Sequence, residues 1–343
     1  AAREPIENDF NMAETQRVCV TGASGYVAGV LIDLLLKSES PKYSVGGTVR
    51  SLANKEKVAH LQKSYPGLEL FEADLLTDGS FDAAFVGCGV VFHTASPFQL
   101  QVEDPQRDLV DPAVNGTRNV LTAAAKAGVK KVVLTSSCAA VVAASEITAT
   151  RVFTEEDWNL ESSLDNAPYR FSKTMAEKEA WKLSKELGFE LAVINPAFVM
   201  GPPVSTRTDG TSIGTVKWLL EGGAKEGAMP MVLGCVDVRD VGLAHIRAAE
   251  RSEATGKRFI LSSEKAYAQL EMAAMIKAAL EKIGGAEKLI ANLPTTQKGD
   301  APLPALYNHS QAETVLGIDF KPLEQTLSEM VAFFLDNGIV SKC

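Results

Sequence analysis

The sequence VCVTGASGYVA, residues 18–28, passes from a short β-branched run into a segment with helical spacing. Gly22 permits the tight turn between them, and Gly25 lets the backbone approach a ligand closely. The following helix directs its N-terminal amides and positive dipole end at the turn. A glycine turn does not by itself imply a ligand. The G-x-x-G-x-x-A spacing at the first strand–helix junction, however, predicts a site for a dinucleotide pyrophosphate. The expected ligands are Gly22, Ser24, Gly25, Tyr26 and Val27.

Beyond this turn, short apolar runs alternate with segments at helical spacing. We expect strands at 17–20, 43–49, 68–71, 89–93, 131–135 and 190–194, and helices at 26–36, 55–62, 81–85, 109–127 and 169–187. The alternation predicts a doubly wound, Rossmann-type α/β fold with a parallel sheet. The Lys and Glu residues of 177–186 are expected to form a solvated helix face.

After residue 196 the pattern changes to loops, short helices, a strand near 258–261 and an amphipathic helix at 323–335. These changes predict three regions. They are a disordered leader at 1–12, a dinucleotide-binding domain at 13–195, and a smaller, mainly substrate-binding lobe at 196–343. We expect this lobe to be interleaved with returning elements of the main sheet.

The composition excludes several classes of protein. A net charge of −9 over 343 residues argues against a broad surface for nucleic acid or anionic membrane. The five cysteines are far apart and form no C-x-x-C pair, which disfavours a zinc site or a disulfide framework. No apolar run approaches the roughly 20 residues that span a bilayer. We therefore predict a cytoplasmic monomer or homodimer without a metal, a nucleic-acid partner or a membrane partner.

The second expected strand ends in TVRS, residues 48–51. NAD-binding sites usually place a carboxylate there, whereas Arg50 would pair with a 2′-phosphate. Lys57 is a candidate second cation, although Lys55 is also available. In EADL, residues 72–75, Asp74 beside Leu75 is positioned to accept from the adenine amino group, unless it caps a helix instead. These residues predict NADPH as the cofactor.

The catalytic candidates are Ser137, Tyr169 and Lys173. Tyr169 and Lys173 are spaced i, i+4, so they lie on one helix face, and Ser137 follows Thr135 and Ser136 at a strand end where ligands collect. Reduction of a carbonyl needs a hydride on carbon and a proton on oxygen. A phenol has a pKa of about 10, and we expect the Lys173 ammonium and the positive nicotinamide ring to lower that of Tyr169. Lys173 can also hold the hydroxyls of the nicotinamide ribose. Ser137 would donate to the substrate oxygen.

Nine stretches carry a resemblance to a known family: VTGASGYVA (20–28), TVRS (48–51), EADL (72–75), VFHTASP (91–97), NGTRNVL (115–121), VVLTSS (132–137), YRFSKTMAEKEAW (169–181), NPAFVMGP (195–202) and VDVRDVGLAHI (236–246). The chain resembles the extended, atypical short-chain dehydrogenase/reductases, in the group of dihydroflavonol, cinnamoyl-CoA and fungal or yeast aldehyde reductases. The resemblance implies that the cofactor contacts Thr94, Ala95, Ser96, Pro196, Ala197, Phe198 and Val199. It also implies a structural role for Asp240.

Departures from this family bear on the substrate. Ala113 stands where many extended members have Asn, so the site is interpreted as a triad. Residues 139–142 lack the Asn of flavonoid reductases, and 167–171 lack the aromatic signature of cinnamoyl-CoA reductases. We therefore expect NADPH-dependent reduction of varied aldehydes and ketones, such as aryl aldehydes, α-keto esters and small dicarbonyls. The expected apolar substrate wall comprises Phe98, Phe198, Val199, Met200, Met229 and Met231, beside Ser137.

Three alternatives stay open. A dihydroflavonol- or cinnamoyl-CoA-type reductase would share the fold and the triad. A hydroxysteroid-type dehydrogenase or an epimerase would retain Tyr-x-x-x-Lys, although the mainly apolar or small residues of 198–235 disfavour a nucleotide-sugar substrate. A non-enzymatic NADPH sensor would tend to lose Tyr169 or Lys173, and both are present.

Overall fold

The computed structural model describes residues 15–39, 42–96 and 102–342. Its centre is a seven-stranded parallel sheet in the order β10-β7-β5-β4-β1-β2-β3. The order reverses between β1 and β4, which is where doubly wound sheets open a crevice for ligands. This topology confirms the predicted Rossmann-type fold. The strands are β1 (Gln16–Val20), β2 (Tyr43–Val49), β3 (Glu69–Glu72), β4 (Val90–His93), β5 (Lys131–Thr135), β7 (Glu190–Pro196) and β10 (Arg258–Leu261).

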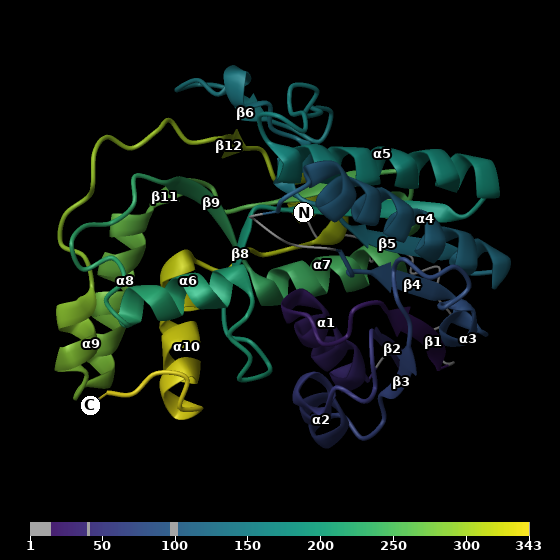
Figure 1. The fold of residues 1–343 in the computed structure, drawn as a ribbon, viewed down its shortest axis with the longest axis horizontal. Helices are drawn as coiled ribbons and strands as arrows, with labels where there is room; N and C mark the ends of the chain where they lie inside the picture. Colours follow the sequence, from purple (N-terminus) through teal and green to yellow (C-terminus); the bar gives the residue numbers. More distant parts are fainter. Residues whose placement is uncertain (1–14, 40–41, 97–101, 343) are drawn as a thin grey trace, which may run out of the picture.

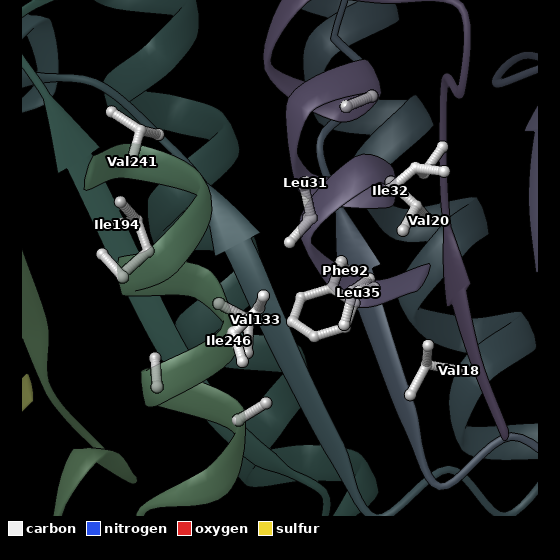
Figure 2. Close-up of a cluster of buried hydrophobic side chains, with 14 of the residues drawn as sticks. Val18, Val20, Leu31, Ile32, Leu35, Phe92, Val133, Ile194, Val241 and Ile246 are labelled. Atoms are coloured by element: carbon white, nitrogen blue, oxygen red, sulfur yellow. The ribbon is translucent and has the colours of Figure 1, made fainter. Parts of the chain in front are cut away.

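Helices cover both faces of the sheet because successive strand residues point to opposite sides. In β1, Val18 and Val20 enter one buried cluster, while Cys19 enters another. The first cluster lies under α1 (Tyr26–Lys37), α2 (Lys55–Ser64) and α7 (Val238–Glu250), and Figure 2 shows its side chains between helices and strands. The second lies under α3 (Asp82–Phe85), α4 (Asp111–Lys126) and α5 (Pro168–Leu187).

A second group of elements has its own apolar core, which includes Met200, Ile276 and Phe334. It contains a three-stranded sheet, which the sequence patterns did not predict, and lies at the far end of the molecule from β1, β2 and β3 (Figure 1). Its elements are β8 (Phe198–Met200), α6 (Thr211–Leu220), β9 (Val232–Asp237), β11 (Ala266–Ala268), α8 (Gln269–Ile283), α9 (Glu287–Asn292) and α10 (Leu323–Asp336).

Short elements complete the described chain. β6 (Val152–Phe153) pairs in parallel with β12 (Leu306–Tyr307), and 3-10 turns occupy Cys138–Ala140, Ala144–Glu146 and Ser252–Ala254. One-turn π-helices occupy Gln106–Val110 and Ala312–Leu316. The first explains why α4 begins at Asp111, two residues later than expected. Within the described ranges no helix is both long and apolar enough to cross a bilayer.

Gly47 marks a close approach between β2 and the glycine turn. A Cβ at this position would lie 2.8 Å from the Cβ of Ala23 and 3.3 Å from Leu70 Cδ2. The Ala23 Cβ is attached directly to the turn backbone, so it cannot swing aside as a long side chain would. Gly47 therefore sets the distance between β2 and residues 22–25.

We predict that Gly47→Ala lowers the free energy of unfolding by about 1–3 kcal/mol, because a methyl group overpacks this contact. Urea denaturation measures the change. Gly67→Ala is the matched control, since nothing lies within 4 Å of its added Cβ, and its effect should stay within about 0.5 kcal/mol. Equal effects of the two substitutions would contradict the argument.

Candidate active site

A cleft of about 660 Å³ opens where β1, β2, β3 and β4 end. Half of the predicted cofactor ligands lie together along it, although they come from separate parts of the sequence. They are Gly22, Ser24, Gly25, Arg50, Lys57, Asp74, Leu75, Thr94, Ala95 and Ser96. Sequence analysis missed other lining residues, among them Ser51, Asn54, Asp108, Arg207 and Asp209. Phe98, a predicted substrate contact, lies outside the described residues.

The glycine turn is connected to the strands on both sides of it. The Ala23 amide donates to the Thr48 carbonyl at 2.8 Å, and the Gly22 amide donates to the Thr48 hydroxyl at 3.2 Å. On the other side, the Ala95 amide donates to Thr21 Oγ1 at 3.0 Å. Gly22 has φ +68°, which favours glycine. In the described structure, no side chain caps the start of α1 and no acidic residue lies in its first turn. The N-terminal amides of α1 therefore suit an anion.

The two cationic candidates lie near the start of α2. Arg50 is exposed just after β2, and Lys57 is half-buried in the first turn of the helix. Across the same cleft, Asp74 Oδ1 accepts from the Leu76 amide at 2.8 Å. The Asp74 carboxylate therefore stabilises a local turn while its residue lines the cleft.

The catalytic candidates come together from β5 and α5. Ser137 follows β5, and its Oγ accepts from the Ala139 amide at 3.1 Å. Burial raises the pKa of Tyr169 to about 12, although a hydrogen bond with Ser137 opposes the rise. Lys173 Nζ lies 6.0 Å from the centre of the Tyr169 ring and donates to Ser96 Oγ at 2.9 Å. Because Ser96 lines the cleft, this contact connects the catalytic candidates to it.

Among the described residues, burial outweighs the expected lowering of the Tyr169 pKa, and that pKa rises instead. Burial dominates the raised pKa of Tyr169. Burial also lowers the pKa of Lys173 to about 8, although the Glu177 carboxylate opposes that change. Desolvation penalises the charged form of each group, so both are driven towards neutrality. The phenol of Tyr169 is consequently protonated at neutral pH.

Glu177, one helical turn beyond Lys173, is buried and accepts hydrogen bonds from four residues, one of which is Trp181 of the same helix. Arg258 Nε donates to Oε1 at 2.6 Å, while Ser136 Oγ and Asn195 Nδ2 donate to Oε2 at 2.5 and 2.8 Å. Asn195 Nδ2 also donates to the Ser137 carbonyl at 3.1 Å. This network sets the position of Ser137 relative to α5. The predicted solvated face at 177–186 is therefore wrong at Glu177, because β10 brings Arg258 against it.

The remaining predicted ligands are not among the residues that line this cleft. The Thr135 hydroxyl is hydrogen-bonded to His245 at 2.6 Å, and the Ser136 hydroxyl belongs to the Glu177 network. The Tyr26 hydroxyl donates to the Gly201 carbonyl at 2.6 Å. Val27 packs against the core of the main sheet. Pro196 ends β7 beside Ala197, and Phe198 and Val199 are half-buried in β8.

The predicted substrate wall is divided between core and surface. Met200 is buried in the core that β8 shares with α10. Met229 is exposed, and Met231 is half-buried. Asp240, expected to be structural, is buried and its carboxylate contacts Lys321 Nζ at 3.0 Å. Only Phe198 and Val199 remain as half-buried apolar candidates close in sequence to the end of β7.

Comparisons with known proteins agree with this fold. Residues 18–261 match the model of the NAD dependent epimerase/dehydratase family. The chain is 38% identical to a cinnamoyl-CoA reductase of Medicago truncatula, over 92% of this chain and 94% of that protein. It is 34% identical to tetraketide alpha-pyrone reductase 1 of Arabidopsis thaliana, over 95% and 97%. The structure of yeast methylglyoxal/isovaleraldehyde reductase complexed with NADPH superposes with a TM-score of 0.80 and 30% identity, covering 95% of this chain and 100% of that one.

We predict that Glu177→Ala lowers the free energy of unfolding by about 3–5 kcal/mol, because Arg258 would keep a buried charge without its carboxylate. Glu281→Ala is the matched control: Glu281 pairs with Lys277 at 3.7 Å on the exposed side of α8. That change should cost less than about 1 kcal/mol. Denaturant unfolding of both variants measures the difference, and a small effect at Glu177 would show that the network contributes little.

Proposed function

The chain belongs to the NAD-dependent epimerase/dehydratase family, and from that premise we propose that it is an NADPH-dependent reductase of aldehydes and ketones. Membership together with its similarity to reductases makes it an NAD(P)-dependent oxidoreductase. The observation that carries the proposal is the 2.9 Å contact between Lys173 and Ser96. It places Lys173, whose Nζ lies 6.0 Å from the centre of the Tyr169 ring, against a cleft whose other lining residues include Arg50 and Lys57.

The described residues of the cleft fit NADPH. At Gly25 an added Cβ would lie 3.1 Å from the Gly22 carbonyl, so a side chain would crowd the turn. The amides at the start of α1 suit the pyrophosphate. Arg50 and Lys57 suit a 2′-phosphate, Asp74 suits the adenine amino group, and Lys173 suits the hydroxyls of the nicotinamide ribose. Bound NADPH supplies the hydride for the carbonyl carbon.

The residues of this chain supply the proton and the orientation. Ser137 donates a hydrogen bond to the substrate oxygen and holds it beside Tyr169. The Tyr169 phenol then transfers its proton to that oxygen as negative charge develops there. The resulting phenolate is stabilised by the Lys173 ammonium. A pKa of about 12 keeps Tyr169 protonated before the reaction, as the reductive direction requires.

Apolar surroundings support an uncharged carbonyl substrate. Cys138, next to Ser137 in the chain, belongs to a buried cluster that includes Val141, Val142 and Phe153, and Ala197 and Tyr307 pack against it. The similar yeast reductase is named for methylglyoxal and isovaleraldehyde. We therefore propose a substrate range that includes aryl and aliphatic aldehydes, α-keto esters and small dicarbonyls.

A second candidate is reduction of an acyl-CoA thioester to the aldehyde with release of the CoA thiol. The 38% identity to a cinnamoyl-CoA reductase favours it. The two candidates share the cofactor site and the proton donor, so only the substrate separates them.

A substrate panel tests the proposed function. NADPH oxidation is followed at fixed enzyme concentration with aldehydes, α-keto esters, dicarbonyls, dihydroflavonols and acyl-CoA esters. We expect turnover of several aldehydes and ketones. Turnover confined to CoA thioesters would favour the second candidate, turnover confined to dihydroflavonols would reject both, and no NADPH oxidation at all would reject the reductase.

We predict that Tyr169→Phe lowers turnover at least about a hundredfold, because it removes the proton donor and keeps the ring. NADPH affinity should change little. Tyr65→Phe is the matched control, since the Tyr65 hydroxyl contacts Asp33 on α1 at 2.9 Å, away from the catalytic candidates. It should retain turnover. Steady-state kinetics with the best carbonyl substrate of the panel measures the turnover of both variants. A Tyr169→Phe enzyme that keeps most of its turnover would rule out Tyr169 as the proton donor.

We predict that NADPH binding weakens as the pH rises through about 8, the pKa to which burial lowers Lys173. Below this pH the ammonium donates charge-assisted hydrogen bonds to the ribose, and above it the neutral amine donates weaker ones, a difference of about fivefold in affinity. Fluorescence titrations between pH 7 and 9.5 measure the dissociation constant. Lys173→Met should bind weakly at every pH, and a pH dependence that persists in this variant would assign the titration to another group.

A further inference from the structure

The segment between β8 and α6 reaches across to the glycine turn. Arg207 Nη1 donates to the Ser24 carbonyl, although the two residues are far apart in sequence. Val204 approaches α1 so closely that a Cβ added at Gly29 would lie 2.8 Å from Val204 Cγ2. Figure 1 shows this loop descending from β8 beside α1. Residues that follow β8 thus help to enclose the dinucleotide cleft.

Arg207 brings a positive charge to the cations already in that cleft. Arg50, Lys57 and Arg207 all line it. The charge of Arg207 also acts on α2: after burial, it is the second cause of the lowered pKa of His60. The guanidinium therefore lies between the glycine turn and α2, the helix whose first turn carries Lys57.

Asp209 supplies the carboxylate that pairs with Arg207. Its Oδ2 accepts from Arg207 Nη2 at 2.5 Å. Burial alone would raise the pKa of Asp209, but Arg207, with a smaller contribution from Lys57, holds that pKa below its usual value. The other two aspartates of the cleft have different partners, since Asp74 accepts from the Leu76 amide and Asp108 pairs with Arg107.

We propose that Arg207 is a third cation for the 2′-phosphate of NADPH, beside Arg50 and Lys57, and that Asp209 is its counter-ion until the phosphate replaces it. A guanidinium presents five N–H donors in a fork that matches a phosphate. The Asp209 side chain is 58% exposed, so exchanging this ion pair for a phosphate contact costs little. The inference rests on the proposed use of NADPH and adds a determinant of cofactor choice.

The test is isothermal titration calorimetry of the full chain with NADPH, NADH, adenosine 2′,5′-bisphosphate and 5′-AMP. Arg207→Gln removes the charge but keeps a donor for the Ser24 carbonyl, so the loop can stay in place. We expect it to weaken NADPH and adenosine 2′,5′-bisphosphate at least about tenfold while NADH and 5′-AMP change less than about twofold. Arg50→Gln should show the same selective loss.

Asp209→Asn separates a counter-ion from a residue that merely orients Arg207. As a counter-ion it competes with the phosphate, so its removal should tighten NADPH binding several-fold and leave NADH unchanged. Weaker NADPH binding in Asp209→Asn, or an equal loss for NADPH and NADH in Arg207→Gln, would overturn the inference. If Arg207→Gln binds NADPH as the wild type does, this inference alone fails. Wild-type protein that binds neither nucleotide would instead reject the proposed function.

Discussion

The buried carboxylate of Glu177 constrains the arrangement of several elements at once. Placed on α5, it accepts from Arg258 of β10, from Asn195 of β7 and from Ser136 just after β5. A buried charge is costly unless it is paired and hydrogen-bonded, so these elements must meet in one geometry. The same meeting point places the Ser137 carbonyl against Asn195 and the Tyr169–Lys173 face of α5 beside Ser137. The position of the catalytic candidates thus follows from satisfying one carboxylate in the interior.

The cleft depends on a different constraint, the reversal of strand order between β1 and β4. The glycine turn is held at this crevice by hydrogen bonds on both sides. The Gly22 amide donates to the Thr48 hydroxyl of β2, and the Ala95 amide, after β4, donates to the Thr21 hydroxyl. The loop after β8 then closes over the turn through Arg207. A phosphate bound here would meet oriented amides from α1 and cations from two distant segments. Its affinity would therefore depend partly on the backbone of the fold and partly on individual side chains.

Burial decides the protonation of the catalytic pair. It moves the pKa of Tyr169 up to about 12 and that of Lys173 down to about 8, so it opposes charge on both groups. In the proposed reaction the phenol would therefore hold the proton that a carbonyl reduction needs, and Lys173 would titrate in the range where its proposed hydrogen bonds to a ribose matter. Neighbouring positive charge favours the phenolate of Tyr169, but desolvation is the larger effect and sets the direction of the shift.

Local sequence determined the strands of the main sheet, the glycine turn, the i, i+4 pair of Tyr169 and Lys173 and the cation Arg50, because periodicity and short spacing encode which residues share a face or follow a strand. Tertiary structure alone decided that Glu177 is buried, since Arg258 reaches it from 81 positions along the chain. It also decided that Arg207 meets Ser24 across 183 positions. The small sheet of β8, β9 and β11 escaped prediction for the same reason. Its strands are short, and their partners come from distant segments. These strands therefore form through pairing and burial, and no local sequence pattern specifies them.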